Sequence, residues 1–77
     1  MKRITLFTQK NCPHCKDAER YMTEKGYPFR RVDVASPNGR KELNQTGARS
    51  VPVLKVGDRV LIGWNMKQLE AQLHAKD

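Results

Sequence analysis

Residues 9–22, with the sequence QKNCPHCKDAERYM, hold both cysteines of the chain and place them at the start of an expected helix. Asn11 is a good helix N-cap, and Pro13 suits the first helical turn, where its missing N–H is not needed. We therefore expect Cys12 at the helix start, where free backbone N–H groups and the helix dipole favour a thiolate. Cys12 is the predicted nucleophile.

Cys15 lies one turn further into this helix, where fewer backbone N–H groups are free. It is the predicted resolving thiol, which attacks a mixed disulfide formed at Cys12 and closes the pair. The dipole supplies at most about 2 kcal/mol of thiolate stabilisation. His14, between the cysteines, can donate a hydrogen bond or carry charge, so we expect it to add to this. The alternative is that His14 is a solvated residue without such a role.

A C-x-x-C motif can also be half of a zinc site or a structural disulfide. A closed zinc site needs four ligands, and the other candidates are His14, within the motif, and His74, near the other end of the chain. A disulfide ring this small removes little entropy from the unfolded chain. The sequence therefore favours redox chemistry and predicts no metal site.

The chain has 77 residues, and we expect one small domain over residues 1–77. Its first residues, 1–8, contain basic side chains but neither a sustained apolar run nor a cleavage site, so no signal peptide is expected. No transmembrane segment is expected either. The default compartment is the cytoplasm, where cysteines in a motif are more often catalytic than structural.

Fifteen Lys and Arg against eight Asp and Glu give a formal charge of +7, which raises the question of nucleic-acid binding. The charges are spread through every segment, and no aromatic residues alternate with them to stack bases. We therefore favour a basic, solvated surface over a nucleic-acid site. Such a surface would attract anionic substrates and acidic partners.

The hydrophobic pattern predicts the order β-α-β-α-β-β-α. Strands are expected at residues 4–8, 29–34, 51–56 and 59–62, and helices at 12–25, from 36 to 45 or 46, and after the N-cap Asn65. Gly57-Asp58 indicates a two-residue hairpin, and the first crossover is long enough for a helix between parallel strands. Arg30 and Arg31 suggest that the second strand lies at an edge. These features predict an α/β fold, a four-stranded mixed sheet with helices on both faces.

Two helices carry apolar stripes that we expect to face the core. The first comprises Cys15, Ala18, Tyr21 and Met22, and the last Met66, Leu69 and Leu73.

This order, a C-P-x-C motif after the first strand and a Val-Pro before the third resemble a glutaredoxin of the thioredoxin fold. The resemblance covers essentially the whole chain. It implies a thiol–disulfide oxidoreductase with no bound cofactor, using glutathione as reductant or co-substrate. It also implies a cis peptide bond before Pro52 and pairing of the Val51 backbone with an extended cysteinyl substrate. From the residues alone, an ordinary trans Pro52 at a strand start is equally acceptable.

Glutaredoxins hold glutathione by a Lys two residues before the nucleophile, an aromatic residue within the motif, a Thr-Val-Pro, and a Gly-Gly-x-Asp turn. Here Lys10 matches, Ser50 stands for the Thr, and His14 for the aromatic residue. The turn Gly63-Trp64-Asn65-Met66 lacks the second glycine and the carboxylate, and Asn65 would bind an ammonium less strongly. The implied substrate-binding residues are Lys10, His14, Ser50, Val51, Pro52, Gly63, Trp64 and Asn65.

The C-P-H-C sequence is also similar to that of strongly oxidising DsbA-type proteins. In those proteins the two intervening residues, here Pro13 and His14, stabilise the thiolate and make the disulfide easier to reduce. Lys10 would tune or steer in the same way. Trp64 has two interpretations: an aromatic residue of the core or its rim, or part of a surface that meets a protein partner.

We therefore predict a monomeric cytosolic dithiol oxidoreductase that reduces protein or glutathione mixed disulfides and is regenerated by an external reductant, through the glutathione reductase system or thioredoxin reductase. The main alternative is a thioredoxin-like electron donor, for example to ribonucleotide reductase, recharged by thioredoxin reductase. Two other classes stay open: an iron–sulfur or metal carrier with Cys12 as a ligand, and a non-catalytic redox adaptor. No membrane or nucleic-acid partner is expected.

Overall fold

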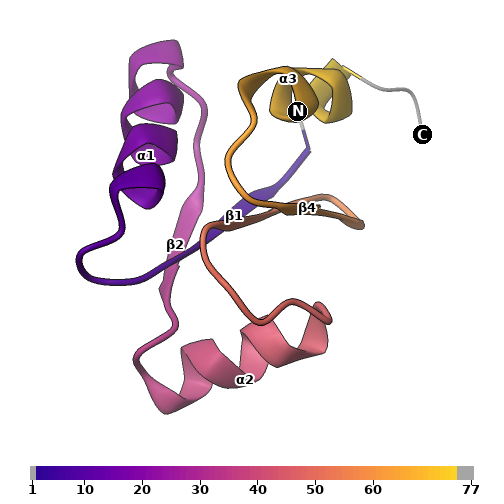
Figure 1. Cartoon of the computed structure of the whole chain (residues 1–77). Coiled ribbons are helices and arrows are strands. Elements are labelled where there is room, and N and C mark those ends of the chain that lie inside the picture. Colours follow the sequence, from indigo (N-terminus) through magenta and orange to yellow (C-terminus); the bar gives the residue numbers. More distant parts are fainter. Residues whose placement is uncertain (1, 75–77) are drawn as a thin grey trace.

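The computed structural model describes residues 2–74. The expected order of elements is confirmed (Figure 1). The strands and helices are β1 (Ile4–Thr8), α1 (Pro13–Lys25), β2 (Arg30–Asp33), α2 (Pro37–Gln45), β3 (Val53–Val56), β4 (Arg59–Ile62) and α3 (Met66–His74). None of these helices has the length and apolar character needed to cross a bilayer.

The strands form one mixed sheet in the order β2-β1-β3-β4. β1 pairs in parallel with β2 and antiparallel with β3, and β3 pairs antiparallel with β4 through the Gly57-Asp58 hairpin. All of β1 is buried, as expected for the central strand. The edge position of β2 is confirmed, since Arg30 and Arg31 are exposed. This is the arrangement that the resemblance to the thioredoxin fold implied.

Helices cover both faces of the sheet, as predicted. In Figure 1, α1 and α3 lie on one side of the strands and α2 on the other. The core between the sheet and the α1/α3 layer consists of Ile4, Leu6, Ala18, Met22, Leu54, Val56, Leu69 and Leu73. The smaller core toward α2 consists of Phe7, Val32, Val34, Leu43, Ala48 and Val53. The alternation of Leu6 and Phe7 between the two cores follows from the two-residue period of a strand.

Three of the sequence predictions need correction, two on strand boundaries and one on burial. β2 is shorter than expected, because Phe29 and Val34 lie outside the ladder. β3 begins at Val53 instead of Val51, since Pro52 has no N–H to donate to a neighbouring strand. Met66 is 48% exposed, because the face of α3 that packs on the sheet begins one turn later, at Leu69.

Candidate active site

The sulfur of Cys12 caps the N-terminus of α1. Cys12 has an extended backbone (φ −109°, ψ 103°), and its Sγ accepts a hydrogen bond from the Cys15 N–H at 3.3 Å. The prediction of Asn11 as the cap is wrong, because Asn11 adopts a left-handed conformation (φ 64°), which Asn tolerates better than most residues. The sulfur of the candidate nucleophile therefore accepts a hydrogen bond from an N–H that has no partner within the helix, and this bond favours the thiolate.

Cys15 lies beneath Cys12 and is almost fully buried, with 1% of its surface exposed, whereas Cys12 is half-buried. Both are free thiols. Burial, and after it the hydrogen bond with Cys12, raise the pKa of the Cys15 thiol above its ordinary value. Cys15 therefore stays protonated while Cys12 is the accessible sulfur. The roles of nucleophile for Cys12 and resolving thiol for Cys15 stay predictions.

The sheet register brings Pro52 and Gly63 to the end of the sheet at which β1 leads into the cysteine motif. β1 ends at Thr8, and the pairing of Phe7 with Val53 places Pro52 opposite Thr8 when the register is extended by one residue. The pairing of Val53 with Ile62 places Gly63 beside Pro52 in the same way, and the Gly63 N–H donates to the Pro52 carbonyl at 2.8 Å. The cis peptide bond between Val51 and Pro52 is confirmed.

The turn that leads into α3 carries two of the implied substrate-binding residues, Trp64 and Asn65. Trp64 is half-buried against the α1/α3 core, and its ring lies 5.4 Å from the ring of Tyr21, which agrees with the interpretation as a rim aromatic. Asn65 is confirmed as the α3 N-cap, since its Oδ1 accepts from the Gln68 N–H at 3.1 Å. The Asn65 amide oxygen is thus already engaged within the chain.

A hollow of about 210 Å³ lies beside Val51. It is lined by Gln9, Val34, Arg40, Leu43, Asn44, Arg49, Ser50 and Val51. Sequence reasoning did not select Arg40 or Arg49, because basic residues spread along the chain are interpreted as solvated surface charge. Both residues are exposed, and they make the lining of this hollow basic.

A larger hollow, of about 1070 Å³, lies toward the opposite end of the sheet, where the chain enters β1 and the β3–β4 hairpin turns. Arg3, Lys55 and Asp58 are among its lining residues, but none of the predicted site residues is. Its size therefore does not make it the candidate active site.

Lys10 and His14 are both exposed near Cys12 in the sequence. Within residues 2–74, no hydrogen bond or ion pair joins either side chain to the Cys12 sulfur. Their proposed effect on the thiolate stays a prediction. The same residues contain no group of three or more His, Cys, Asp and Glu side chains that could hold a metal ion.

Residues 4–61, which include both cysteines and the cis Pro52, match the family model described as Glutaredoxin. The chain belongs to the glutaredoxin family. Glutaredoxins are thiol–disulfide oxidoreductases, and the sulfur pair at the start of α1 is the part of this chain that such chemistry requires.

Curated relatives and a solved structure agree with this glutaredoxin assignment. N-acetyl-S-hydroxy-L-cysteine reductase of Bacillus subtilis is 34% identical over 56 residues, which are 70% of this chain and 60% of that relative's length. Glutaredoxin-like protein NrdH of Salmonella typhimurium is 36% identical over 56 residues, covering 71% of this chain and 69% of the relative. The solved NrdH-redoxin of Escherichia coli superposes with a TM-score of 0.80 at 29% identity, over 97% of this chain and 99% of that one.

Proposed function

We propose that this chain is a single-domain, cytoplasmic dithiol oxidoreductase that reduces protein or glutathione mixed disulfides through Cys12 and Cys15. The observation that carries the proposal is the half-buried Cys12 at the N-cap of α1, with the buried Cys15 one turn behind it. Cys12 is the nucleophile and Cys15 the resolving thiol.

The reaction transfers two electrons to the substrate. The Cys12 thiolate attacks one sulfur of the substrate disulfide, the S–S bond breaks, and the other sulfur leaves as a thiolate that takes up a proton. Cys15 then loses its proton and attacks the Cys12 sulfur, which releases the second substrate thiol and forms a Cys12–Cys15 disulfide. An external thiol reductant reverses these steps and restores the dithiol.

The substrate would lie along the edge formed by Ser50, Val51 and Pro52, with the Val51 backbone pairing to its cysteinyl residue. Gly63, Trp64 and Asn65 would form the opposite side. Arg40 and Arg49, beside Val51, suit an anionic thiol such as glutathione. Lys10 and His14 would steer the substrate or stabilise the thiolate, together with the fixed turn at Pro13.

A second candidate function is that of an electron donor, for example to ribonucleotide reductase, recharged by thioredoxin reductase. Asn65 favours it, because its amide oxygen caps α3 and the turn over residues 63–66 contains no carboxylate to bind the ammonium of glutathione. Ile62 and Met66, 59% and 48% exposed, flank the same turn and offer apolar surface to a protein. The NrdH relatives point the same way, since the Escherichia coli structure is described by a thioredoxin-like activity profile.

Both functions need no bound cofactor, membrane or nucleic acid, and a monomer suffices for either. Their partners differ. One uses glutathione and glutathione reductase, and the other uses thioredoxin reductase.

The deciding experiment is regeneration of the oxidised protein by glutathione with glutathione reductase, beside regeneration by NADPH with thioredoxin reductase. Turnover with glutathione supports the first function, and turnover with thioredoxin reductase alone supports the second. Absence of turnover in both systems would contradict the proposal of an oxidoreductase. Arg49→Gln should raise the KM for glutathione, whereas Arg59→Gln, at the far end of β4, is the matched control and should leave it unchanged.

A further inference from the structure

We propose that Glu70 is a positioning residue for the candidate site, because it fixes Tyr21 and, through Tyr21, the indole of Trp64. The inference rests on the proposed function, in which Trp64 forms one side of the substrate-binding edge. Glu70 itself does not touch the sulfur atoms of the site, and its role is to keep that side of the edge in one orientation.

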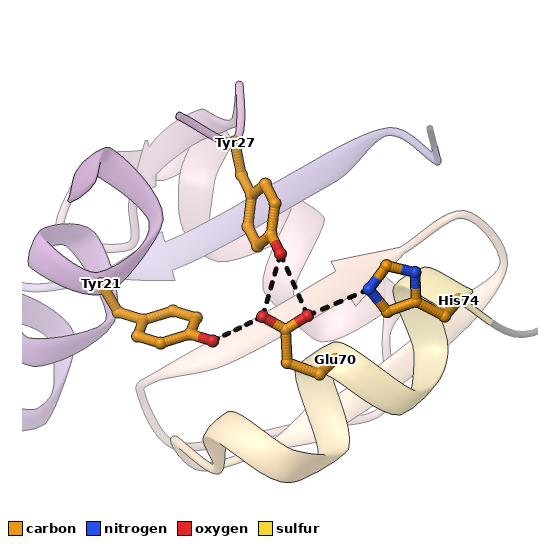
Figure 2. A network of polar contacts seen from close by, with 4 residues as sticks. All are labelled: Tyr21, Tyr27, Glu70 and His74. Carbon is orange, nitrogen blue, oxygen red and sulfur yellow. Dashed lines mark hydrogen bonds and ion pairs between the residues drawn. The ribbon is translucent and has the colours of Figure 1, made fainter. Parts of the chain in front are cut away.

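The carboxylate of Glu70 joins three parts of the chain (Figure 2). Its Oε1 accepts from the hydroxyl of Tyr21 at 2.5 Å and from that of Tyr27 at 2.9 Å. Its Oε2 accepts from Tyr27 at 3.0 Å and lies 3.3 Å from Nε2 of His74, one turn along α3. One side chain of α3 is therefore hydrogen-bonded to Tyr21 of α1 and to Tyr27 in the segment between α1 and β2.

The anchored Tyr21 ring supports Trp64. The two ring centroids are 5.4 Å apart at an interplanar angle of 58°, and the ring of Tyr27 lies edge-on to Tyr21 at 6.5 Å and 65°. Aromatic pairs at such separations have orientation-dependent attraction. Because the Tyr21 hydroxyl is held by Glu70, the ring cannot rotate away from Trp64 without breaking a hydrogen bond.

The backbone on either side of Trp64 is already fixed. Gly63 donates its N–H to Pro52, and Asn65 caps α3. With this backbone fixed, the contact with the Tyr21 ring sets the orientation of the Trp64 indole. Trp64 directly follows Gly63, whose N–H donates to the carbonyl of Pro52, the residue after the Val51 with which the proposed substrate pairs.

Glu70 and Tyr21 keep their charge states across the neutral range. The hydrogen bonds from Tyr21 and Tyr27 hold the pKa of Glu70 below its ordinary value, and the bond to Glu70 raises the pKa of Tyr21 to about 12. Lys25 lies 5.7 Å from the centre of the Tyr21 ring and adds a cation to the same cluster. The carboxylate and hydroxyl thus keep the charge states that their hydrogen bond needs.

The apolar core can hold α1 and α3 together without this cluster. Ala18 and Met22 of α1 and Leu69 of α3 are fully buried in it, whereas partly exposed polar contacts contribute little to stability. Loss of the Glu70 carboxylate should therefore affect Trp64 more than the fold.

Trp64 is the only tryptophan of the chain, so tryptophan fluorescence reports on the surroundings of this one residue. The test compares Glu70→Gln and Tyr21→Phe with the wild type. Glu19→Gln is the matched control, because Glu19 is an α1 carboxylate bonded to Arg31 on the surface. We expect faster acrylamide quenching of Trp64 in the first two variants and unchanged quenching in the control.

The kinetic readout is reduction of a synthetic mixed disulfide between glutathione and a cysteine-containing peptide. We expect KM to rise roughly 3-fold to 10-fold with unchanged kcat in Glu70→Gln and Tyr21→Phe, as loss of an oriented aromatic contact implies. Unchanged quenching, or a fall in kcat at constant KM, would overturn the positioning role. If the wild type itself does not turn over, the proposed function fails. The quenching comparison then still decides whether Glu70 positions Trp64. Tyr21→Phe, which removes only one hydroxyl, keeps the proposal testable if Glu70→Gln does not fold. Tyr27→Phe, which keeps the Tyr21 bond, should leave quenching unchanged.

Discussion

Helices α1 and α2 begin with the same local arrangement but serve different purposes. Each has an extended N-cap residue followed by proline, and each cap side chain accepts a hydrogen bond from the N–H three residues on. In α1 the Cys12 sulfur accepts from Cys15 at 3.3 Å, and in α2 the Ser36 hydroxyl accepts from Gly39 at 3.0 Å. The geometry of a proline-started helix is therefore not what makes α1 the candidate reactive centre.

The difference lies in the capping atom and its other contacts. The Ser36 hydroxyl also donates to the Asp33 carbonyl at 2.8 Å, so it is bonded on both sides. Cys12 is half-buried, and among residues 2–74 the hydrogen bonds of its sulfur are with Cys15, in its own turn. A helix start supplies the N–H donor, but reactivity needs a sulfur whose outer side is open to a substrate.

The third residue of each helix differs as well. In α1 this position holds the buried Cys15 thiol. In α2 it holds Gly39, where an added Cβ would lie 1.9 Å from the Asp33 carbonyl oxygen. The first turn of α1 has room for a second reacting group, whereas the first turn of α2 is closed by the backbone of Asp33 at the end of β2.

The largest effect is expected from Cys12→Ser, which gives α1 the same capping atom as α2. Turnover should fall below detection while the helical circular dichroism is kept, because Ser is a good N-cap. The matched variant Cys15→Ser should still attack and should accumulate a mixed disulfide visible by mass spectrometry. Loss of the first attack in Cys15→Ser but not in Cys12→Ser would reverse the two roles.

Gly39→Ala should break the α2 turn. The added Cβ has no space beside Asp33, and overpacking of this kind costs about 2–3 kcal/mol, more than the roughly 1 kcal/mol by which Ala improves a helix over Gly. Urea unfolding measures the loss. Asn38→Ala, at the exposed neighbouring position, is the control, and equal stability of both variants would show that the turn can yield.

Ser36→Ala removes the α2 cap and should lower the free energy of unfolding by about 1 kcal/mol. For a domain of this size, that corresponds to a fall in Tm of roughly 4–8 °C. Turnover at a temperature well below Tm should be unchanged, because Ser36 lies outside the candidate site. A loss of turnover at constant stability would mean that the two helix starts are functionally coupled.

The smallest expected effect is on the pH dependence of stability. It distinguishes the third residue of α1, the titratable Cys15, from the third residue of α2, Gly39, which does not titrate. Since the pKa of Cys15 is raised in the fold, the unfolded chain loses this proton first as the pH rises above about 8.5. The unfolded state then binds fewer protons, so stability falls toward alkaline pH. Urea unfolding of the reduced protein should show this fall, with a flatter dependence in Cys15→Ala. Parallel curves would contradict the burial of a neutral thiol.

The parts of the fold that sequence reasoning predicted correctly are those with local signals. Ser36 before a proline, Gly26 after a helical stripe and Gly57-Asp58 between two apolar runs each fix a boundary through their own backbone preferences. The cysteine motif is local in the same sense. The pattern therefore located both the seven elements and the two sulfur atoms.

What the sequence left out depends on long-range contacts or on a choice between neighbours. Tyr21 and Tyr27 lie 49 and 43 residues from Glu70, so no spacing rule links them. Arg49 becomes part of the hollow beside Val51 only once α2 is folded. At the start of α1, Asn11 and Cys12 are adjacent candidates for the cap, and only the conformation of Asn11 decides between them.

The central position of β1 has a consequence for amide hydrogen exchange. β1 is paired on both sides and wholly buried, and such strands usually open only with global unfolding. Cys12 follows the end of β1 by four residues, whereas Ser50 and Val51 lie outside any helix or strand. Protection of the β1 amides should therefore persist through the catalytic cycle, and differences between oxidised and reduced protein should concentrate in the stretch before β3. The nucleophile then follows closely on a slowly exchanging strand, whereas the substrate-pairing edge lies in a stretch that exchanges fast.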